Sequence, residues 1–184
     1  MIGSPHLTSP AAAGEGQVAV TVAIPNWNGA RFLRSCLDSV RSQTFDSFDV
    51  VVVDNGSTDE SLDILAQDYP EVRVVRWSEN RGVAAAFNEG VRQCRGQALA
   101  LLNNDMEVEP GWLQALWDAL DADGSAGAVA AKILFLDRKT INSAGDFYGR
   151  DGIPGNRGVR ELDAGQYNAS DYVFGANGGA SLFR

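Results

Sequence analysis

The sequence has little of three things: cysteine, positive charge and long apolar runs. Its 184 residues include two cysteines, Cys36 and Cys94, both in amphipathic segments. A disulfide framework is therefore not expected, and we predict two core thiols in a protein of the reducing cytoplasm. No stretch approaches the roughly 20 apolar residues needed to cross a bilayer. The chain is predicted to be soluble, and peripheral contact with the inner face of the membrane stays open.

Positive charge is scarce because 15 Lys and Arg stand against 24 Asp and Glu, which gives a formal net charge of −9. An acidic surface repels polyanions, so no nucleic-acid partner is expected. A phosphate ligand would need a metal ion, backbone amides or a few well-placed arginines. The chain is otherwise ordinary, with 45% hydrophobic and 21% charged residues, as in a single globular domain.

Two further absences limit the function class and the domain organisation that the sequence allows. The first apolar run is not followed by the G-x-G-x-x-G turn of a dinucleotide-binding oxidoreductase, which disfavours that class. Residues 1–17 are rich in Ala, Gly, Ser and Pro and have neither a basic start nor an apolar run of signal-peptide length. We predict a disordered leader over residues 1–17 and one domain over residues 18–184.

From residue 18 onward, short apolar runs alternate with segments of helical period. This order predicts an α/β fold, a mostly parallel central sheet with helices on both faces. The predicted strands are 18–24, 50–53, 72–77, 98–102 and 126–135. The predicted helices are 32–43, 62–69 behind a capping box of Ser57 and Glu60, 83–94, and 110–120. Nine of the twenty glycines lie between Gly145 and Gly179, which indicates loops rather than a sheet core.

Polar residues follow three of these strands, where a parallel sheet places its ligands. The candidates are Pro25, Asn26, Trp27 and Asn28 after the first, Asp54, Asn55 and Gly56 after the second, and Asn103, Asn104 and Asp105 after the fourth. Arg81 and Gly82, which open a helix, are further candidates. Each group also reads as ordinary turn chemistry.

Three of these candidates have a specific chemistry. Asp54 either caps a turn or accepts the imide N–H of a uracil or thymine ring. Asp105, predicted to share a side with Asn103 and Glu107, is either solvated or a ligand of Mg²⁺ or Mn²⁺, ions that take one or two carboxylates with phosphate and water. Arg81 is either solvated or a positive charge near a pyrophosphate.

Taken in order, these motifs resemble family 2 glycosyltransferases. The resemblance rests on Pro-Asn-Trp-Asn at 25–28, Val-Asp-Asn-Gly-Ser-Thr-Asp at 53–59, Asn-Arg-Gly at 80–82 with Asn88 and Gly90, and Leu-Leu-Asn-Asn-Asp at 101–105. It covers about residues 18–184 and is nearest to the rhamnosyltransferase-like bacterial polysaccharide subgroup. Each motif alone is weak, but the ordered set is specific.

The resemblance implies a nucleotide-diphospho-sugar transferase fold of the GT-A type and a metal-dependent, inverting enzyme. The donor would be a UDP- or dTDP-sugar, and the acceptor a glycan or lipid-linked saccharide for cell-surface polysaccharide. Residues 25–28 would line the nucleoside, Asp54 would recognise the base, and Asp105 would hold Mg²⁺ or Mn²⁺ as the last acid of the family's DxD motif. Asn103 stands where that motif has its first acid.

The glycine-rich stretch resembles the acceptor side of the family through Ser143-Ala144-Gly145 and residues 175–180. The acidic motif that supplies the base in relatives is not reached before Arg184, so we expect the base beyond it and an incomplete domain. Asp146, Asp151, Glu161 and Asp171 have no motif that marks them as the base. We therefore expect weak donor binding and poor transfer, and the alternative is a non-catalytic nucleotide-sugar-binding fragment.

Overall fold

The computed structural model describes residues 18–184 and contains ten strands and four helices in that range. The predicted leader, residues 1–17, lies outside the described residues. The strands are β1 (Val20–Asn26), β2 (Phe48–Asp54), β3 (Arg73–Arg76), β4 (Ala98–Leu102), β5 (Ala128–Ala130), β6 (Ile133–Leu134), β7 (Ile141–Ser143), β8 (Asp146–Tyr148), β9 (Pro154–Asn156) and β10 (Ala180–Phe183). The helices are α1 (Ala30–Arg41), α2 (Ser61–Asp68), α3 (Val83–Arg92) and α4 (Trp112–Ala122).

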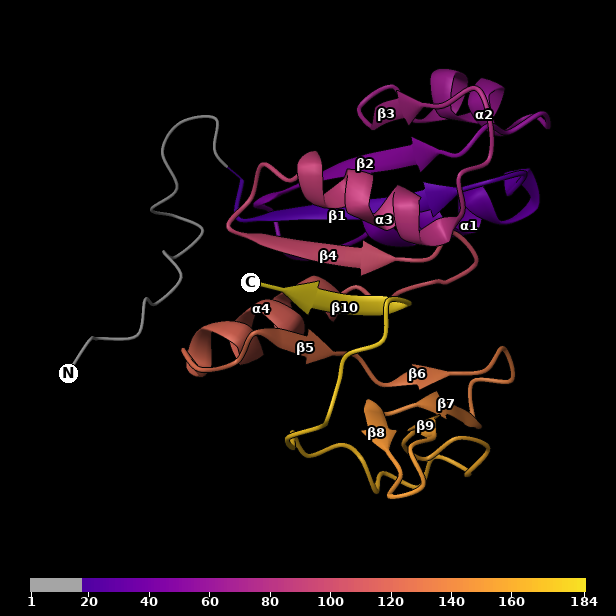
Figure 1. Ribbon diagram of the computed structural model, residues 1–184. Coiled ribbons are helices and arrows are strands. Elements are labelled where there is room, and N and C mark those ends of the chain that lie inside the picture. The colour runs from indigo at the N-terminus through magenta and orange to yellow at the C-terminus, as the bar shows by residue number, and fades with distance from the viewer. Residues whose placement is uncertain (1–17) are drawn as a thin grey trace.

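Six strands form the central sheet in the order β3-β2-β1-β4-β10-β5 (Figure 1). β1 pairs in parallel with both β2 and β4, and β2 pairs in parallel with β3. β10 runs antiparallel between β4 and β5. The parallel register sets Asn26 opposite Asp54, so the carboxyl ends of β1 and β2 meet at one edge. The predicted mostly parallel sheet is confirmed.

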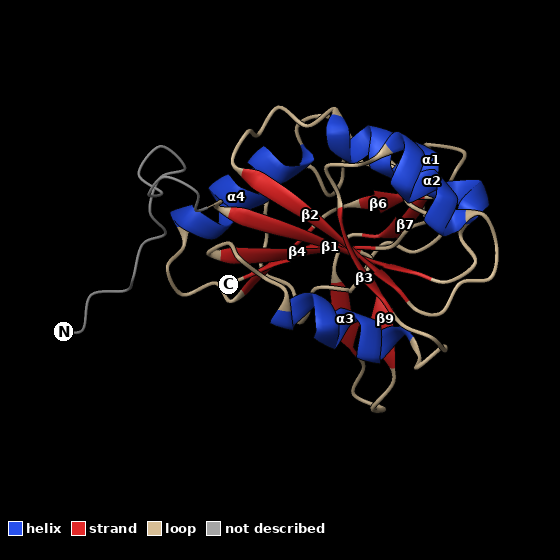
Figure 2. Cartoon of the chain, turned by 90° about the horizontal axis from the view of Figure 1, so that it is seen from above, coloured by secondary structure: helices blue, strands red, loops and turns tan. Residues whose placement is uncertain are grey.

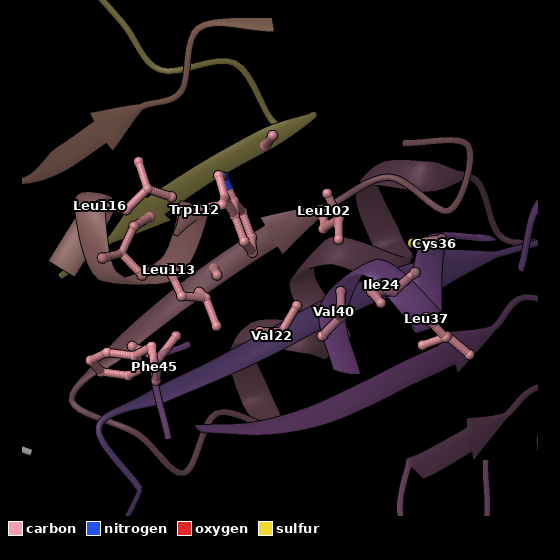
Figure 3. Packing of buried hydrophobic residues seen from close by; sticks show 14 of the residues in the cluster. Val22, Ile24, Cys36, Leu37, Val40, Phe45, Leu102, Trp112, Leu113 and Leu116 are labelled. Atoms are coloured by element: carbon pink, nitrogen blue, oxygen red, sulfur yellow. The ribbon is translucent and has the colours of Figure 1, made fainter. Parts of the chain in front are cut away.

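Helices cover both faces of this sheet, as Figure 2 shows: α1, α2 and α4 lie on one side and α3 on the other. The larger core lies under the three helices and contains fully buried Val22, Leu37 and Leu113 among others (Figure 3). A smaller cluster around Ala23 and Val51 lies under α3. Burial of each large aliphatic side chain contributes about 1.5–3 kcal/mol. Both faces are apolar, which explains the continuous apolar runs of the inner strands.

The cysteines fit the predicted core positions. Cys36 is buried on α1 and Cys94 is half-buried after α3, and both are free thiols. In residues 18–184, none of the helices combines the length and the apolar character that a bilayer span requires.

The predicted fifth strand, 126–135, is wrong in its extent. Only β5 joins the edge of the central sheet, and β6 leaves it to pair with β7. Lys132 lies between the two strands, and its Nζ forms an ion pair with Asp163 at 2.7 Å. The chain therefore leaves the edge of the central sheet at a charged residue, which pairs with the glycine-rich segment, residues 145–179.

The loops predicted between Gly145 and Gly179 are followed by a strand that the sequence patterns did not predict. Short hairpins and loops do occupy residues 141–179, but β10 inserts between β4 and β5. Ala180, Ser181 and Leu182 are buried there. Four residues are too few for a period of two to stand out, and the preceding glycines hide the return to the sheet.

The capping box predicted for Ser57 and Glu60 does not form. α2 begins at Ser61, and Glu60 at its N-cap makes no side-chain capping bond. The Ser57 hydroxyl oxygen instead accepts hydrogen bonds from Asn26 Nδ2 at 3.2 Å and from the Asn28 backbone N–H at 3.0 Å. A residue with the spacing of a helix cap thus belongs to the edge where β1 and β2 end.

Candidate active site

A cavity of about 360 Å³ lies where β1, β2 and β4 end and α3 begins. Its lining residues are Pro25, Asn26, Trp27, Asn55, Asn80, Gly82, Val83, Asn103, Asn104 and Asp105. The sequence predicted all of these except Asn80 and Val83. Four predicted residues do not line the cavity: Asn28, Asp54, Gly56 and Arg81.

Buried hydrogen bonds join the ends of three strands. Asn26 is 1% exposed, and its Nδ2 donates to Asp54 Oδ1 at 3.2 Å. Its Oδ1 accepts from Asn104 Nδ2 at 2.7 Å. Asp54 is fully buried, and its other oxygen accepts the Ser57 N–H at 3.1 Å. Asn26 therefore ties the loop after β4 to the loop after β2.

Gly29 leaves room for this junction. A Cβ atom at this position would lie 2.1 Å from Asn104 Nδ2 and 2.4 Å from Asn26 Oδ1. Contacts below 3.0 Å force a neighbour to move. The absence of a side chain at Gly29, at the N-cap of α1, is thus a condition for the Asn26–Asn104 hydrogen bond.

Asn55 holds the loop before α3 against the cavity. Its Nδ2 donates to Asn80 Oδ1 at 3.1 Å and to the Gly82 carbonyl at 3.2 Å, and its Oδ1 accepts the Arg81 N–H at 2.7 Å. Gly56 has φ +77°, and a Cβ there would lie 2.6 Å from the Glu79 backbone. Asn55 and Gly56 thus hold residues 79–82 in place through direct contacts with that loop.

The loop after β1 presents Trp27 to solvent. Its neighbour Asn28 has φ +49°, and Asn28 Oδ1 accepts the Thr58 N–H at 2.8 Å. Two residues further on, the Ala30 N–H donates to Asp59 Oδ2 at 3.0 Å. Trp27 is 55% exposed although it borders the cavity. Asn28 is thus a scaffold residue that fixes the loop, and Trp27 is free to contact a ligand.

Asp105 is the one charged side chain in the cavity lining. It is exposed and has no hydrogen-bond or ion-pair partner within residues 18–184. Glu107, predicted to share its side, forms an ion pair with Arg138 at 3.1 Å. Behind this loop the Cys36 thiol donates to the Asn103 carbonyl at 3.7 Å. Burial, with smaller contributions from Asp105 and Glu107, raises the pKa of that thiol to about 12, which keeps it neutral and unreactive.

The Arg81 side chain does not lie in the cavity, where it was predicted to meet a pyrophosphate. It forms an ion pair with Glu79 at 3.6 Å, and its guanidinium lies over the Trp77 ring, 5.0 Å from the ring centroid. Gly82 and Asn80 border the cavity in its place. A pyrophosphate in the cavity would meet no lysine or arginine among the lining residues.

The lining residues fit a hard divalent ion. No group of three or more His, Cys, Asp or Glu side chains comes together in the part of the chain that the structure describes, so a closed all-protein site is absent there. Asp105 and the amide oxygens beside it supply the donor set that Mg²⁺ uses when phosphate and water complete its shell. The chemistry of the lining thus agrees with an ion bound together with its ligand.

None of the four carboxylates that were considered as a base in the glycine-rich segment lines the cavity. Asp171 forms an ion pair with Arg157, and Glu161 accepts hydrogen bonds from Gln166 and Tyr167. Asp151 accepts the Ile153 N–H. Asp146 differs, because its Oδ1 is buried without a partner and burial raises its pKa.

Sequence reasoning did not single out Asn80 and Val83 as cavity residues. Asn80 and Val83 lie beside the predicted Arg81 and Gly82, so the segment was found but the wrong side chain was favoured in it. Arginine drew attention because of its charge, whereas the structure turns that charge towards Trp77. Ser57 belongs to the motif at 53–59, and the structure gives it hydrogen bonds to Asn26 and Asn28 at this edge.

The chain matches Glycosyl transferase family 2 over residues 21–178. It is 32% identical to chondroitin synthase of Escherichia coli over 123 residues, which cover 65% of this chain and 18% of that protein. It is also 32% identical to the O-antigen biosynthesis protein RfbC of Myxococcus xanthus over 145 residues, 77% of this chain and 11% of that protein. This chain spans less than a fifth of either relative.

Solved structures agree on the fold. The mannosyltransferase PcManGT from Pyrobaculum calidifontis, in complex with GDP-Man and Mn²⁺, has a TM-score of 0.59 and 27% identity over 71% of this chain and 39% of its own. TarS of S. aureus in complex with UDP-GlcNAc has a TM-score of 0.59 and 23% identity over 63% of this chain and 34% of its own. The fold is therefore of the GT-A type. Because the family match covers most of the described residues, this chain belongs to glycosyl transferase family 2.

Proposed function

We propose that this chain binds a nucleotide-diphospho-sugar, UDP- or dTDP-linked, together with Mg²⁺ or Mn²⁺. The sugar passes with inversion to a glycan or lipid-linked saccharide acceptor in the synthesis of cell-surface polysaccharide. The relatives' names support this setting, since they include an O-antigen biosynthesis protein and a chondroitin synthase. The rhamnosyltransferase-like subgroup, the cytoplasmic location and peripheral contact with the membrane belong to the same proposal.

One observation carries the proposal: the cavity joins an exposed aromatic ring to a single carboxylate and has no cationic side chain in its lining. Trp27 offers a flat apolar surface on which a base can stack. Asp105 would repel a diphosphate in a chain whose net charge is already −9. A diphosphate therefore requires a divalent cation held at Asp105. Such an ion, when bound, acts as a Lewis acid on the leaving diphosphate.

The polar groups that face the cavity without partners suit the rest of a nucleotide. Asn80 Oδ1 accepts hydrogen bonds from Asn55 Nδ2 and the Gly82 N–H, so the NH₂ group of Asn80 remains for a ligand carbonyl or hydroxyl. The side chain of Asn103 has no partner among residues 18–184. These neutral groups add hydrogen bonds without adding charge.

Inverting transfer also needs a base that removes the proton of the acceptor hydroxyl. The cavity lining supplies no residue for this step besides Asp105, which is committed to the cation. A non-catalytic nucleotide-sugar-binding function therefore stays as the second candidate. Turnover of a UDP- or dTDP-sugar by the purified chain decides between the two.

Calorimetric titration tests the donor site. UDP, dTDP and GDP are titrated into the chain in Mn²⁺ and in EDTA, beside Asp105→Ala. We expect UDP or dTDP to bind at least about 10-fold more tightly in Mn²⁺, and Asp105→Ala to lose that gain, because removal of a ligand or its support costs about 10–100-fold in metal affinity.

Glu107→Ala is the matched control, since it removes a carboxylate two residues away that pairs with Arg138 outside the cavity. It should keep the metal-dependent gain. Binding that is equal in Mn²⁺ and EDTA, or absent for all three nucleotides, would contradict the proposal. Tighter binding of GDP than of UDP and dTDP would overturn the pyrimidine assignment alone.

A further inference from the structure

Asp54 occupies an unusual place for a residue expected to read a base. It is fully buried and does not line the cavity. Its two oxygens accept hydrogen bonds from Asn26 Nδ2 and from the Ser57 N–H. No ion pair to Asp54 occurs within the described chain, so its partners there are neutral donors. A buried carboxylate held in this way needs a reason beyond charge balance.

The first consequence concerns the orientation of Asn26. An ionised carboxylate only accepts hydrogen bonds, so the amide group facing it must be the NH₂ of Asn26. The second N–H of that group donates to Ser57 Oγ at 3.2 Å. With both donors committed on one side, Asn26 Oδ1 is forced to face the other side.

The second consequence concerns Asn104. Because Asn26 presents an oxygen, Asn104 must turn its own NH₂ inward, and the two meet at 2.7 Å. Asn104 lines the cavity, and its Oδ1 has no hydrogen-bond partner among residues 18–184. Through the two amides of Asn26 and Asn104, the acceptor at Asp54 therefore sets the orientation of an amide oxygen beside Asp105. Amide oxygens are ordinary ligands of hard divalent cations, whereas an NH₂ group repels them.

We propose that Asp54 is a positioning residue for the cation site, which acts through Asn26 to fix the oxygen of Asn104 towards the coordination shell of an ion at Asp105. This inference rests on the proposed nucleotide and metal binding. It gives Asp54 a role other than the direct base contact expected from the sequence, and the two roles predict different results for one substitution.

Asp54→Asn should reverse the orientation of each side-chain amide in this series. The Ser57 N–H still requires an acceptor, so the new amide places its oxygen there and its NH₂ against Asn26. Asn26 and then Asn104 must rotate to avoid facing donors, and Asn104 turns NH₂ towards the cation. In the double variant Asp54→Asn with Asn104→Asp, the reversed Asn26 donates to the new carboxylate at 104. An acceptor oxygen again faces the ion, with the total charge unchanged.

The experiment measures UDP affinity by calorimetry in EDTA and in Mn²⁺ for the wild type, D54N, N104A and the double variant. We expect D54N, whose Asp54 does not line the cavity, to keep the EDTA affinity within about 2-fold, and both D54N and N104A to lose at least 10-fold of the Mn²⁺-dependent gain. The double variant should recover most of that gain. Asp49→Asn is the matched control on the amino end of β2, where Asp49 pairs with Arg73, and it should behave as the wild type.

The other possible results would each overturn the proposed role of Asp54. Loss of affinity in EDTA by D54N, with the Mn²⁺ gain retained, would mean that Asp54 contacts the base and would overturn the proposal. A D54N chain that keeps both quantities, or a double variant without recovery, overturns it as well. If circular dichroism shows D54N unfolded, N104A and the double variant decide. A wild type that binds no nucleotide refutes the proposed function itself, and this inference with it.

Discussion

The strand ends that form the cavity and the glycine-rich segment after β7 hold their side chains in opposite ways. At the strand ends, Asn26 and Asp54 are 1% and 0% exposed, and every polar atom of their side chains has a hydrogen-bond partner. In the glycine-rich segment, Tyr172 and Phe174 are 84% and 77% exposed, and the strands have three residues each. One region is fixed before any ligand arrives, and the other leaves apolar surface uncovered.

The difference indicates which region of the molecule is pre-organised to bind a ligand. A cation site needs its ligands held in place, because reorganisation on binding reduces affinity. Buried amides provide that rigidity only if every donor and acceptor is paired, so a single change spreads through several residues. Substitutions that disturb the buried amides at the strand ends should therefore alter stability and nucleotide binding together, and substitutions in the exposed segment should alter neither much.

The largest expected effect on stability lies just after the glycine-rich segment, where the chain returns to the central sheet. Leu182 on β10 follows the glycine-rich segment but is fully buried in the central sheet. Leu182→Ala should cost about 2–5 kcal/mol in the free energy of unfolding, as buried leucine truncations do. Leu162→Ala, at a leucine that is 70% exposed, should cost less than about 0.5 kcal/mol. Urea denaturation measures both, and equal costs would mean that β10 does not contribute to the core.

A smaller loss of stability is expected from Gly29→Ala. The new methyl group would meet Asn104 Nδ2 at 2.1 Å, and Gly29 has φ −102°, so the cost is steric rather than conformational. Overpacking of this kind costs about 1–3 kcal/mol, and nucleotide binding in Mn²⁺ should weaken with it.

Gly127→Ala is the control for Gly29→Ala, because no atom lies within 4 Å of the added Cβ. Thermal unfolding should leave it close to the wild type. A Gly29→Ala chain with normal stability and normal UDP affinity would show that Asn26 and Asn104 can separate without consequence.

Trp27→Ala should separate binding from stability at the strand ends. The side chain is 55% exposed, so its removal should change the free energy of unfolding by less than about 0.5 kcal/mol. Base stacking on an aromatic ring contributes about 1–3 kcal/mol, so UDP affinity should fall by about 5- to 150-fold. Tyr172→Ala removes an aromatic ring that is more exposed, at 84%, from the glycine-rich segment and should leave UDP affinity unchanged. The opposite order of effects would move the nucleotide to that segment.

The architecture at the strand ends was predictable because it rests on patterns of local origin. Continuous apolar runs at 50–53 and 98–102 are typical of inner strands, and their order fixes which ends share an edge. Most of the cavity lining followed from that order alone. Asp54 shows the limit, because whether a carboxylate at a strand end faces a ligand or the protein depends on a side chain of another strand, here Asn26 on β1.

The rest depended on contacts between distant residues. Lys132 ends the predicted fifth strand through Asp163, 31 positions later, and no local period signals that pairing. β10 joins the sheet at a place that is set by β4 and β5 rather than by its own four residues. Arg81 turns towards Trp77 and Glu79, where nearby groups compete successfully for a charge that the sequence assigned to a ligand.

The smallest expected effect concerns Asp146, where the exposed segment does bury one polar atom. Its Oδ1 has no partner, and burial raises the pKa of the carboxyl above its unfolded value of about 3.9. The folded chain therefore binds this proton more strongly than the unfolded chain does. The resulting cost is fully present above the folded-state pKa and disappears as the pH falls towards the unfolded value.

Asp146→Asn removes that cost, so the variant should melt at a slightly higher temperature at pH 7, by less than about 2 °C, and should lose this advantage near pH 4. Asp151→Asn is the control from the same segment, since Asp151 is exposed and accepts the Ile153 N–H as an asparagine oxygen also can. Calorimetric melting of both variants between pH 4 and 7 measures the difference. A lower melting temperature for Asp146→Asn at pH 7 would mean that the carboxylate makes a favourable interaction in its ionised form, and the glycine-rich segment would then hold its polar groups as firmly as the strand ends do.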